Sequence, residues 1–189
     1  LYDPATGAFF LKNTNAPGVA DATFTFGGGG LGLRPIVGDW DGNDPETVGL
    51  YNPANGTFFL RNQNAPGAAD IAFSYGAGGT AVPVVGDWDD TDTDTIGIYV
   101  PETGTFFLRN TNAPGAADVV FGFGAGGAGY VPVVGNWDGV GNDTIGLYDP
   151  TTAAFFLKNT NAPGDADLVF NYGPTFMTPL AGDWRGPGA

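Results

Sequence analysis

The sequence predicts an all-β protein, a β-propeller of four four-stranded blades with about 48–49 residues per repeat. Three observations predict it. One block recurs four times, and Tyr2, Tyr51, Tyr99 and Tyr148 mark it at spacings of 49, 48 and 49 residues. Each block divides into short β-branched or aromatic runs separated by turn residues. No window has the 3.6-residue apolar period of a helix.

Each repeat contains four runs of about five residues, which is a usual strand length. The loops between them place Pro early and Gly late, as tight turns prefer. The runs are apolar on both faces, as in Phe58, Phe59 and Leu60, which indicates sheets packed on both sides. The clearest examples of the four strands are residues 131–137, 144–148, 105–109 and 119–123.

Both ends of the chain suggest how a ring of blades would close. The chain opens at Leu1 and Tyr2, in the second strand of a repeat, and residues 179–184 form a first strand. We expect these ends to complete one blade in a velcro closure, which leaves no exposed sheet edge. The prediction is one domain, residues 1–189, with repeats at approximately 1–49, 50–97, 98–146 and 147–189. An eight-bladed ring of two chains, a sandwich and a β-solenoid are the alternatives.

The composition limits the chemistry. The chain has 20 acidic and 6 basic residues, a net charge of −14, and neither His nor Cys. This charge disfavours nucleic acid and anionic membranes as partners. The missing His and Cys exclude the common nucleophile systems, disulfides and thiolate metal sites. No apolar run reaches membrane-spanning length. Because the chain starts at Leu1, we expect a mature or excised fragment.

The loop after the first strand of a repeat is rich in oxygen ligands. It spans residues 38–49, 86–97 and 135–146, and it begins Gly-Asp-Trp-Asp-Gly in its first copy. With the Ile-Gly-Leu-Tyr strand that follows, this motif resembles the FG-GAP/VCBS repeat of the integrin α N-terminal propeller and of many bacterial surface proteins. The resemblance covers all four repeats. It implies a β-propeller, secretion, and calcium in this loop.

The ligand set that the resemblance implies is thin. Loop positions 1, 3 and 5 hold oxygen-bearing side chains in most copies, but position 9 is Thr and an acid stands one residue earlier. Such loops would bind Ca²⁺ weakly, at about 10⁻⁴–10⁻³ M. Val140 at position 5 makes the third loop the poorest. Alternatively, the Asp residues cap turns by accepting local backbone N–H groups. The candidate metal ligands are Asp39, Asp41, Asn43, Glu46, Asp87, Asp89, Thr91, Asp94, Asn136, Asp138 and Asp143.

Other recurring residues favour structural roles. A basic residue ends the third strand of every repeat, at Lys12, Arg61, Arg109 and Lys158. We expect it to pair with an Asp of a neighbouring blade. The candidate partners, which also recur, are Asp21, Asp70, Asp118 and Asp167. The tryptophans Trp40, Trp88, Trp137 and Trp184 are expected to pack between blades. Residues 27–34 and 174–178 break the repeat symmetry and are the best positions for a unique site.

We therefore expect a secreted or cell-surface bacterial protein that is not an enzyme. Its predicted role is extracellular binding or adhesion, with a protein or glycan ligand in pockets that repeat between blades. One alternative is a structural subunit of a surface or filament assembly, with copies of itself as partners. The other is a carbohydrate-active enzyme using paired Asp residues in one deep cleft.

Overall fold

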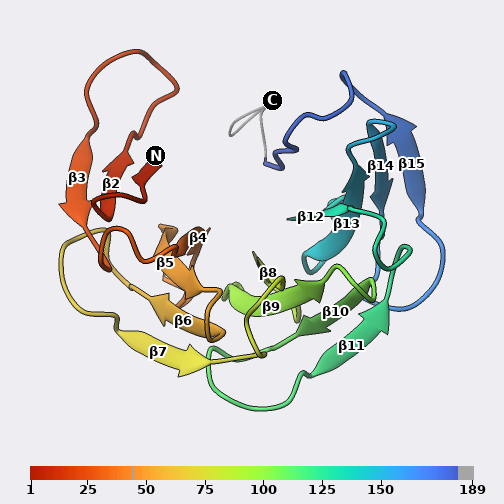
Figure 1. Ribbon diagram of the computed structural model, residues 1–189, viewed down its shortest axis with the longest axis horizontal. Helices are drawn as coiled ribbons and strands as arrows, with labels where there is room; N and C mark the ends of the chain where they lie inside the picture. The colour runs from red at the N-terminus through yellow and green to blue at the C-terminus, as the bar shows by residue number, and fades with distance from the viewer. Residues whose placement is uncertain (44, 183–189) are drawn as a thin grey trace. The chain divides into compact units, whose positions relative to one another are not determined.

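The computed structural model describes residues 1–43 and 45–182, and all regular elements in this part of the chain are β-strands. The fold is all-β, with one three-stranded and three four-stranded antiparallel sheets. The chain divides into two compact units, Leu1–Ala81 with Thr111–Gly115, and Val82–Asn110 with Ala116–Ala189. Each unit contains two of the sheets (Figure 1).

The strands follow one another along each sheet as a meander. In the first unit, the first sheet contains β1 (Tyr2–Asp3), β2 (Ala8–Leu11) and β3 (Ala22–Thr25), and the second contains β4 (Arg34–Gly38), β5 (Thr47–Asn52), β6 (Thr57–Leu60) and β7 (Ile71–Ser74). In the second unit, the third sheet contains β8 (Val82–Gly86), β9 (Thr95–Val100), β10 (Thr105–Leu108) and β11 (Val119–Gly122), and the fourth contains β12 (Val131–Gly135), β13 (Thr144–Asp149), β14 (Ala154–Leu157) and β15 (Leu168–Asn171). The four strands given as examples of the repeat, residues 131–137, 144–148, 105–109 and 119–123, are confirmed to within two residues.

The antiparallel register stacks one Tyr and two Phe side chains across three neighbouring strands of every sheet. In the second sheet, Tyr51 faces Phe58, and Phe58 faces Phe73. The Tyr and Phe ring centroids lie 4.6–4.8 Å apart, and those of the two Phe rings 5.2–5.9 Å apart. We call this the aromatic face of a sheet. Aromatic pairs at these distances stabilise the fold beyond their buried area.

The opposite face of the second and fourth sheets, here called the receiving face, packs against the preceding sheet of the same unit. Because side chains alternate along a strand, Val48 and Leu50 of β5 point away from Tyr51. They form one core cluster with Phe9 and Phe24 on the aromatic face of the first sheet. In the second unit, Ile145 and Leu147 pack in the same way on the aromatic face of the third sheet. This double packing explains why β5 and β13 are buried over five successive residues.

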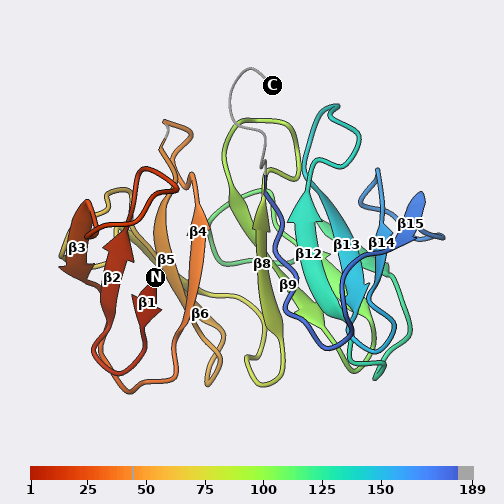
Figure 2. The same cartoon turned by 90° about the horizontal axis from the view of Figure 1, so that it is seen from above.

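The first strands of the third and fourth sheets, β8 and β12, contact each other within the second unit (Figure 2). Of the tryptophans predicted to pack in the core, Trp40 and Trp88 are buried, whereas Trp137 is only half-buried. Trp184 lies outside the described residues.

The turn between the second and third strands requires a left-handed backbone. Gly56 has φ = +70°, and a Cβ there would lie 2.6 Å from the carbonyl oxygen of Gly76. The fourth sheet has Ala153 at the equivalent position, with φ = +56°. A non-glycine residue in this region costs about 1 kcal/mol, so this turn stores strain that its counterparts avoid.

The predicted closing strand, residues 179–184, is only partly described. Residues 179–182 are not in a strand, and Asp183 and Trp184 lie outside the described residues. Within the described part of the chain, β1 pairs with β2 only. Across residues 1–43 and 45–182, no helix has the length and apolarity needed to span a bilayer.

Candidate functional site

The acidic loop of the third sheet is held by its own backbone. The Asp87 carboxylate accepts hydrogen bonds from the backbone N–H groups of Asp89, Thr91 and Asp92, at 3.3, 3.1 and 2.8 Å. The Thr91 hydroxyl donates to Asp89 at 2.8 Å. In the loop after β4, Asp39 accepts the N–H of Asn43 at 3.2 Å. These bonds are the turn-capping alternative to metal binding.

Asp143, one of the candidate metal ligands, connects two sheets instead. Its carboxylate accepts the backbone N–H of Asp87 at 3.2 Å, and its own N–H donates to the Asp87 carbonyl at 2.8 Å. The neighbouring Asn142 donates to the Trp88 carbonyl at 3.0 Å. Burial raises the pKa of Asp143, and the nearby Asp87 charge raises it further, while the bond from Asp87 N–H opposes both. The acid therefore joins the fourth sheet to the third.

The threonine at loop position 9 also has a structural partner. Thr47 is buried, and its hydroxyl donates to the carbonyls of Gly38 and Arg61, at 3.3 and 2.6 Å. Thr95 and Thr144 make the equivalent bond to Gly86 and Gly135. At this position the threonine hydroxyl therefore bonds to backbone carbonyls, where the resemblance implies a carboxylate or amide ligand.

The described residues of these loops do not bring their carboxylates together. Ca²⁺ requires six to eight converging oxygen atoms. Within residues 1–43 and 45–182, no three acidic side chains come together in a way that could hold a metal. The Asp87 oxygens accept backbone N–H groups in this loop, and weak calcium binding by the loops stays a prediction.

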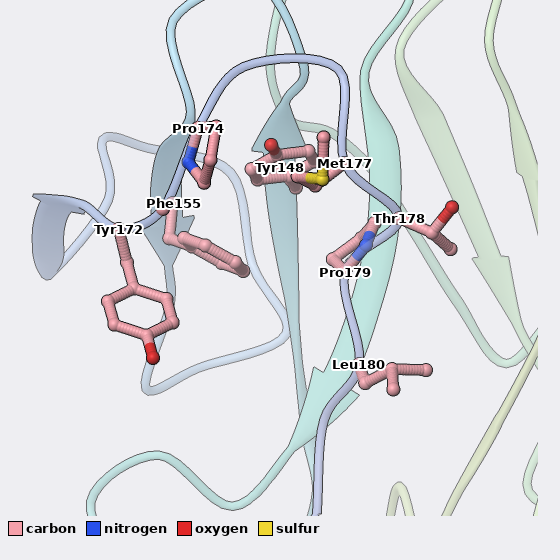
Figure 3. A pocket seen from close by; sticks show the side chains of 9 residues that line it. Tyr148, Phe155, Tyr172, Pro174, Met177, Thr178, Pro179 and Leu180 are labelled. Carbon is pink, nitrogen blue, oxygen red and sulfur yellow. The ribbon is translucent and has the colours of Figure 1, made fainter.

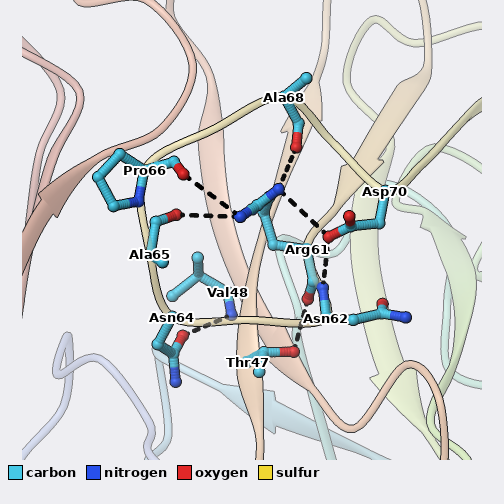
Figure 4. Close-up of polar contacts among 9 residues, drawn as sticks. All are labelled: Thr47, Val48, Arg61, Asn62, Asn64, Ala65, Pro66, Ala68 and Asp70. Carbon is cyan, nitrogen blue, oxygen red and sulfur yellow. Dashed lines mark hydrogen bonds and ion pairs between the residues drawn. The ribbon is translucent and has the colours of Figure 1, made fainter.

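The recurring base is enclosed by the loop that follows it. The Arg61 guanidinium donates to the carbonyl oxygens of Ala65, Pro66 and Ala68, and it pairs with Asp70 at 3.3 Å (Figure 4). Asp70 also accepts the N–H of Asn62 at 2.9 Å. A Cβ at residue 67 would lie 3.0 Å from the guanidinium, which explains the glycine there. The Asn-Ala-Pro-Gly loop is thus folded around an internal cation.

The predicted ion pair is found in three repeats, with a correction to its position. Lys12 pairs with Asp21 at 3.3 Å, and Arg109 with Asp118 at 3.5 Å. All three pairs join residues of one hairpin, not of neighbouring blades, because the loop of eight residues between them returns the Asp to its own hairpin. Lys158 donates instead to the Asp165 carbonyl and lies 5.3 Å from the Phe123 ring of the third sheet.

A pocket opens at the same place between the two sheets of each unit. The volumes are about 330 Å³ in the first unit and about 200 Å³ in the second. Eight lining positions correspond, each pair exactly two repeats or 97 residues apart. The pairs are Phe26 and Phe123, Gly27 and Gly124, Leu33 and Tyr130, Leu50 and Leu147, Phe59 and Phe156, Gly67 and Gly164, Ala68 and Asp165, and Ala69 and Ala166.

These pockets are apolar with few polar groups. Phe59 and Phe156 line these pockets and are only partly buried, and the Phe156 ring also contacts the Tyr130 ring, with centroids 6.0 Å apart. Asn52 adds an amide to the first pocket, and Asp165 adds a carboxylate to the second. Aromatic and aliphatic walls with one polar group are typical of small-ligand sites.

A larger pocket of about 640 Å³ lies on the aromatic face of the fourth sheet. The segment after β15 runs across this face, with Pro174 and Met177 beside Tyr148 and Phe155 (Figure 3). Tyr172 and Leu180 are exposed at its margin. Both symmetry-breaking segments of the sequence, residues 27–34 and 174–178, therefore line pockets.

Sequence reasoning did not identify the individual residues of the repeated pockets. Leu33, Leu50 and Phe59 look like core residues in the sequence. One pattern in the sequence could have identified them. Residues 67–69 follow Phe59 at the same spacing at which residues 164–166 follow Phe156. Comparison with known proteins adds nothing to this geometry: no family model, no curated protein and no solved structure matches the chain.

Proposed function

We propose that this chain is a non-catalytic binding and adhesion module that holds its ligand in the repeated pockets between sheets. The observation that supports the proposal most strongly is the correspondence of eight lining positions in two separate units. The four sheets would be the blades of an FG-GAP/VCBS-like propeller, and this resemblance is also the reason to place the protein outside a bacterial cell, secreted or on the surface.

A glycan with neutral or basic sugars is the ligand class that fits best. The pockets are at or below the lower end of the volumes of small-ligand sites, about 300–1,000 Å³, so each would take a single ring. An aromatic wall suits the apolar face of a sugar, and Asn52 or Asp165 could bond its hydroxyl groups. The net charge of −14 disfavours acidic sugars. Several equivalent sites would give avidity for a repeating polymer.

Catalysis is not part of the proposal. The chain has no His or Cys. Asp143 and Asp87, whose charges interact, use their carboxylates on backbone N–H groups of the fold. Weak calcium binding stays a prediction, and nothing in the binding mode depends on it.

The test is a glycan array followed by calorimetric titration of the best neutral oligosaccharide. We expect Phe59→Ala and Phe156→Ala each to weaken binding by about 10-fold, the effect of losing roughly 1.4 kcal/mol of contact, and the double variant to weaken it further. Val120→Ala removes an exposed apolar side chain that lines neither pocket, so it should bind normally. Unchanged binding in the folded double variant, or capture of protein ligands only, would contradict the proposal.

A further inference from the structure

The two repeated pockets share one plan but carry different side chains at equivalent positions. Leu33 of the first pocket corresponds to Tyr130 of the second, and Ala68 corresponds to Asp165. Each pocket lies within one unit, between its two sheets, and the other lining positions correspond as described above. The exchanged side chains therefore decide how the ligands of the two pockets differ.

The second pocket places a carboxylate beside aromatic rings. The ring centroids of Tyr130 and Phe156 lie 6.0 Å apart, with the ring planes at 48°, and Phe123 adds a third ring to the lining. Asp165 is exposed, and its carboxylate makes no hydrogen bond or ion pair within residues 1–43 and 45–182. A carboxylate without a structural partner, next to aromatic rings, suits a primary ammonium group, because the carboxylate pairs with its charge and the ring faces attract it.

The first pocket is more apolar. Leu31 lines it and is 63% exposed, whereas the equivalent residue of the second unit is the smaller Ala128, which does not line its pocket. The polar side chain of the first pocket is the uncharged amide of Asn52. This pocket therefore suits a neutral ring with an apolar face.

The basic residue behind the second pocket is already used by the fold. Lys158 is 3% exposed, and its ammonium group donates to the backbone carbonyl of Asp165 at 3.0 Å and lies 5.3 Å from the centroid of the Phe123 ring. This leaves the Asp165 carboxylate to a ligand. The Lys158 charge also opposes a ligand cation, which keeps the expected preference for a cation small.

We propose that the two pockets bind different sugars, and that Asp165 makes the second pocket selective for an amino sugar while the first pocket takes a neutral one. The ammonium group of the sugar would pair with the Asp165 carboxylate, and its ring would pack on Phe156. This assignment rests on the proposed function, which makes the ligand a sugar.

The test compares two probes that differ in one group, methyl glucoside and methyl 2-amino-2-deoxyglucoside, at about pH 6, where a primary amine is protonated and an exposed carboxylate is ionised. NMR titration suits weak binding, and the backbone amides of Gly27 and Gly124 report the first and second pockets separately. Asp165→Asn removes the charge, and Ala68→Asp introduces it into the first pocket. Asp90→Asn is the control, because Asp90 is exposed, lines neither pocket, and has a left-handed backbone (φ = +60°) that Asn tolerates.

We expect the second pocket of the wild type to bind the amino sugar about 5-fold more tightly than the neutral sugar, the effect of one exposed ion pair. Salt and Asp165→Asn should each reduce this preference, Asp90→Asn should keep it, and Ala68→Asp should create it in the first pocket. Equal binding of the two sugars at the second pocket, or a preference that survives Asp165→Asn, would overturn the assignment and leave the proposed function in place. Binding of neither sugar at either pocket would overturn both.

Discussion

Arg61 offers the clearest test of how the loops are held. The Arg61 side chain is only 10% exposed. Arg61→Met keeps the length of its aliphatic stem and removes the guanidinium. The variant loses the bonds to three carbonyl groups and the pair with Asp70.

A hydrogen bond to a charged group contributes about 1.5–3 kcal/mol. The Asp70 side chain is 44% exposed, so solvent screening holds the ion pair to below about 1 kcal/mol. The freed carbonyls lie in a largely exposed loop and regain water. We therefore expect a loss of about 2–3 kcal/mol in the free energy of unfolding, well below the sum of the individual bonds.

Lys12→Met is the matched control, because Lys12 occupies the same repeat position with a side chain that is 32% exposed. It should cost less than about 1 kcal/mol. Denaturant unfolding measures the global effect, and amide exchange at Asn62 and Asp70 measures the loop, since their N–H groups bond to Asp70 and Leu60. Equal losses in the two variants, with unchanged exchange in Arg61→Met, would refute the account of an enclosed cation.

Two further predictions concern the acidic loops. The pKa of Asp143 is raised by burial, so the stability that its protonated form contributes is fully present below the unfolded-state pKa and is lost as pH rises through the folded-state pKa. Asp143→Asn should therefore increase stability over the wild type most at neutral pH. Paired thermal melts should show this gain in stability vanish below about pH 3.8. A gain that does not depend on pH would contradict the assignment. If the loops bind calcium weakly, millimolar Ca²⁺ should raise the melting temperature over an EGTA control, whereas an unchanged temperature would remove the metal from the account.

Much of the fold could be predicted from the sequence because its signals are local. Strand positions follow from β-branched and aromatic runs between Gly and Pro turns, and the 48–49-residue period identifies equivalent positions in every repeat. The pairing of Arg61 with Asp70 could be anticipated for the same reason, since both recur at constant spacing. Its location within one hairpin could not, because spacing alone does not say which strand a loop returns to.

The site depended on contacts between residues far apart in the chain. Asp143 has the same local sequence context as a metal ligand, and only the approach of the third sheet makes it a partner of the Asp87 backbone. Likewise, Phe59 becomes a pocket wall because the fold brings it to Phe26 and Leu33, which lie far from it in the sequence.

The amino-acid sequence by itself therefore determined the strands, their two apolar faces and the repeated cation, since each depends on residues a few positions apart. Only the tertiary structure decided which faces are covered, where the pockets open and whether the loop oxygens converge. Those properties depend on how one sheet packs on the next, and similar repeats meet different neighbours: Phe24 is buried while the equivalent Phe170 is 40% exposed.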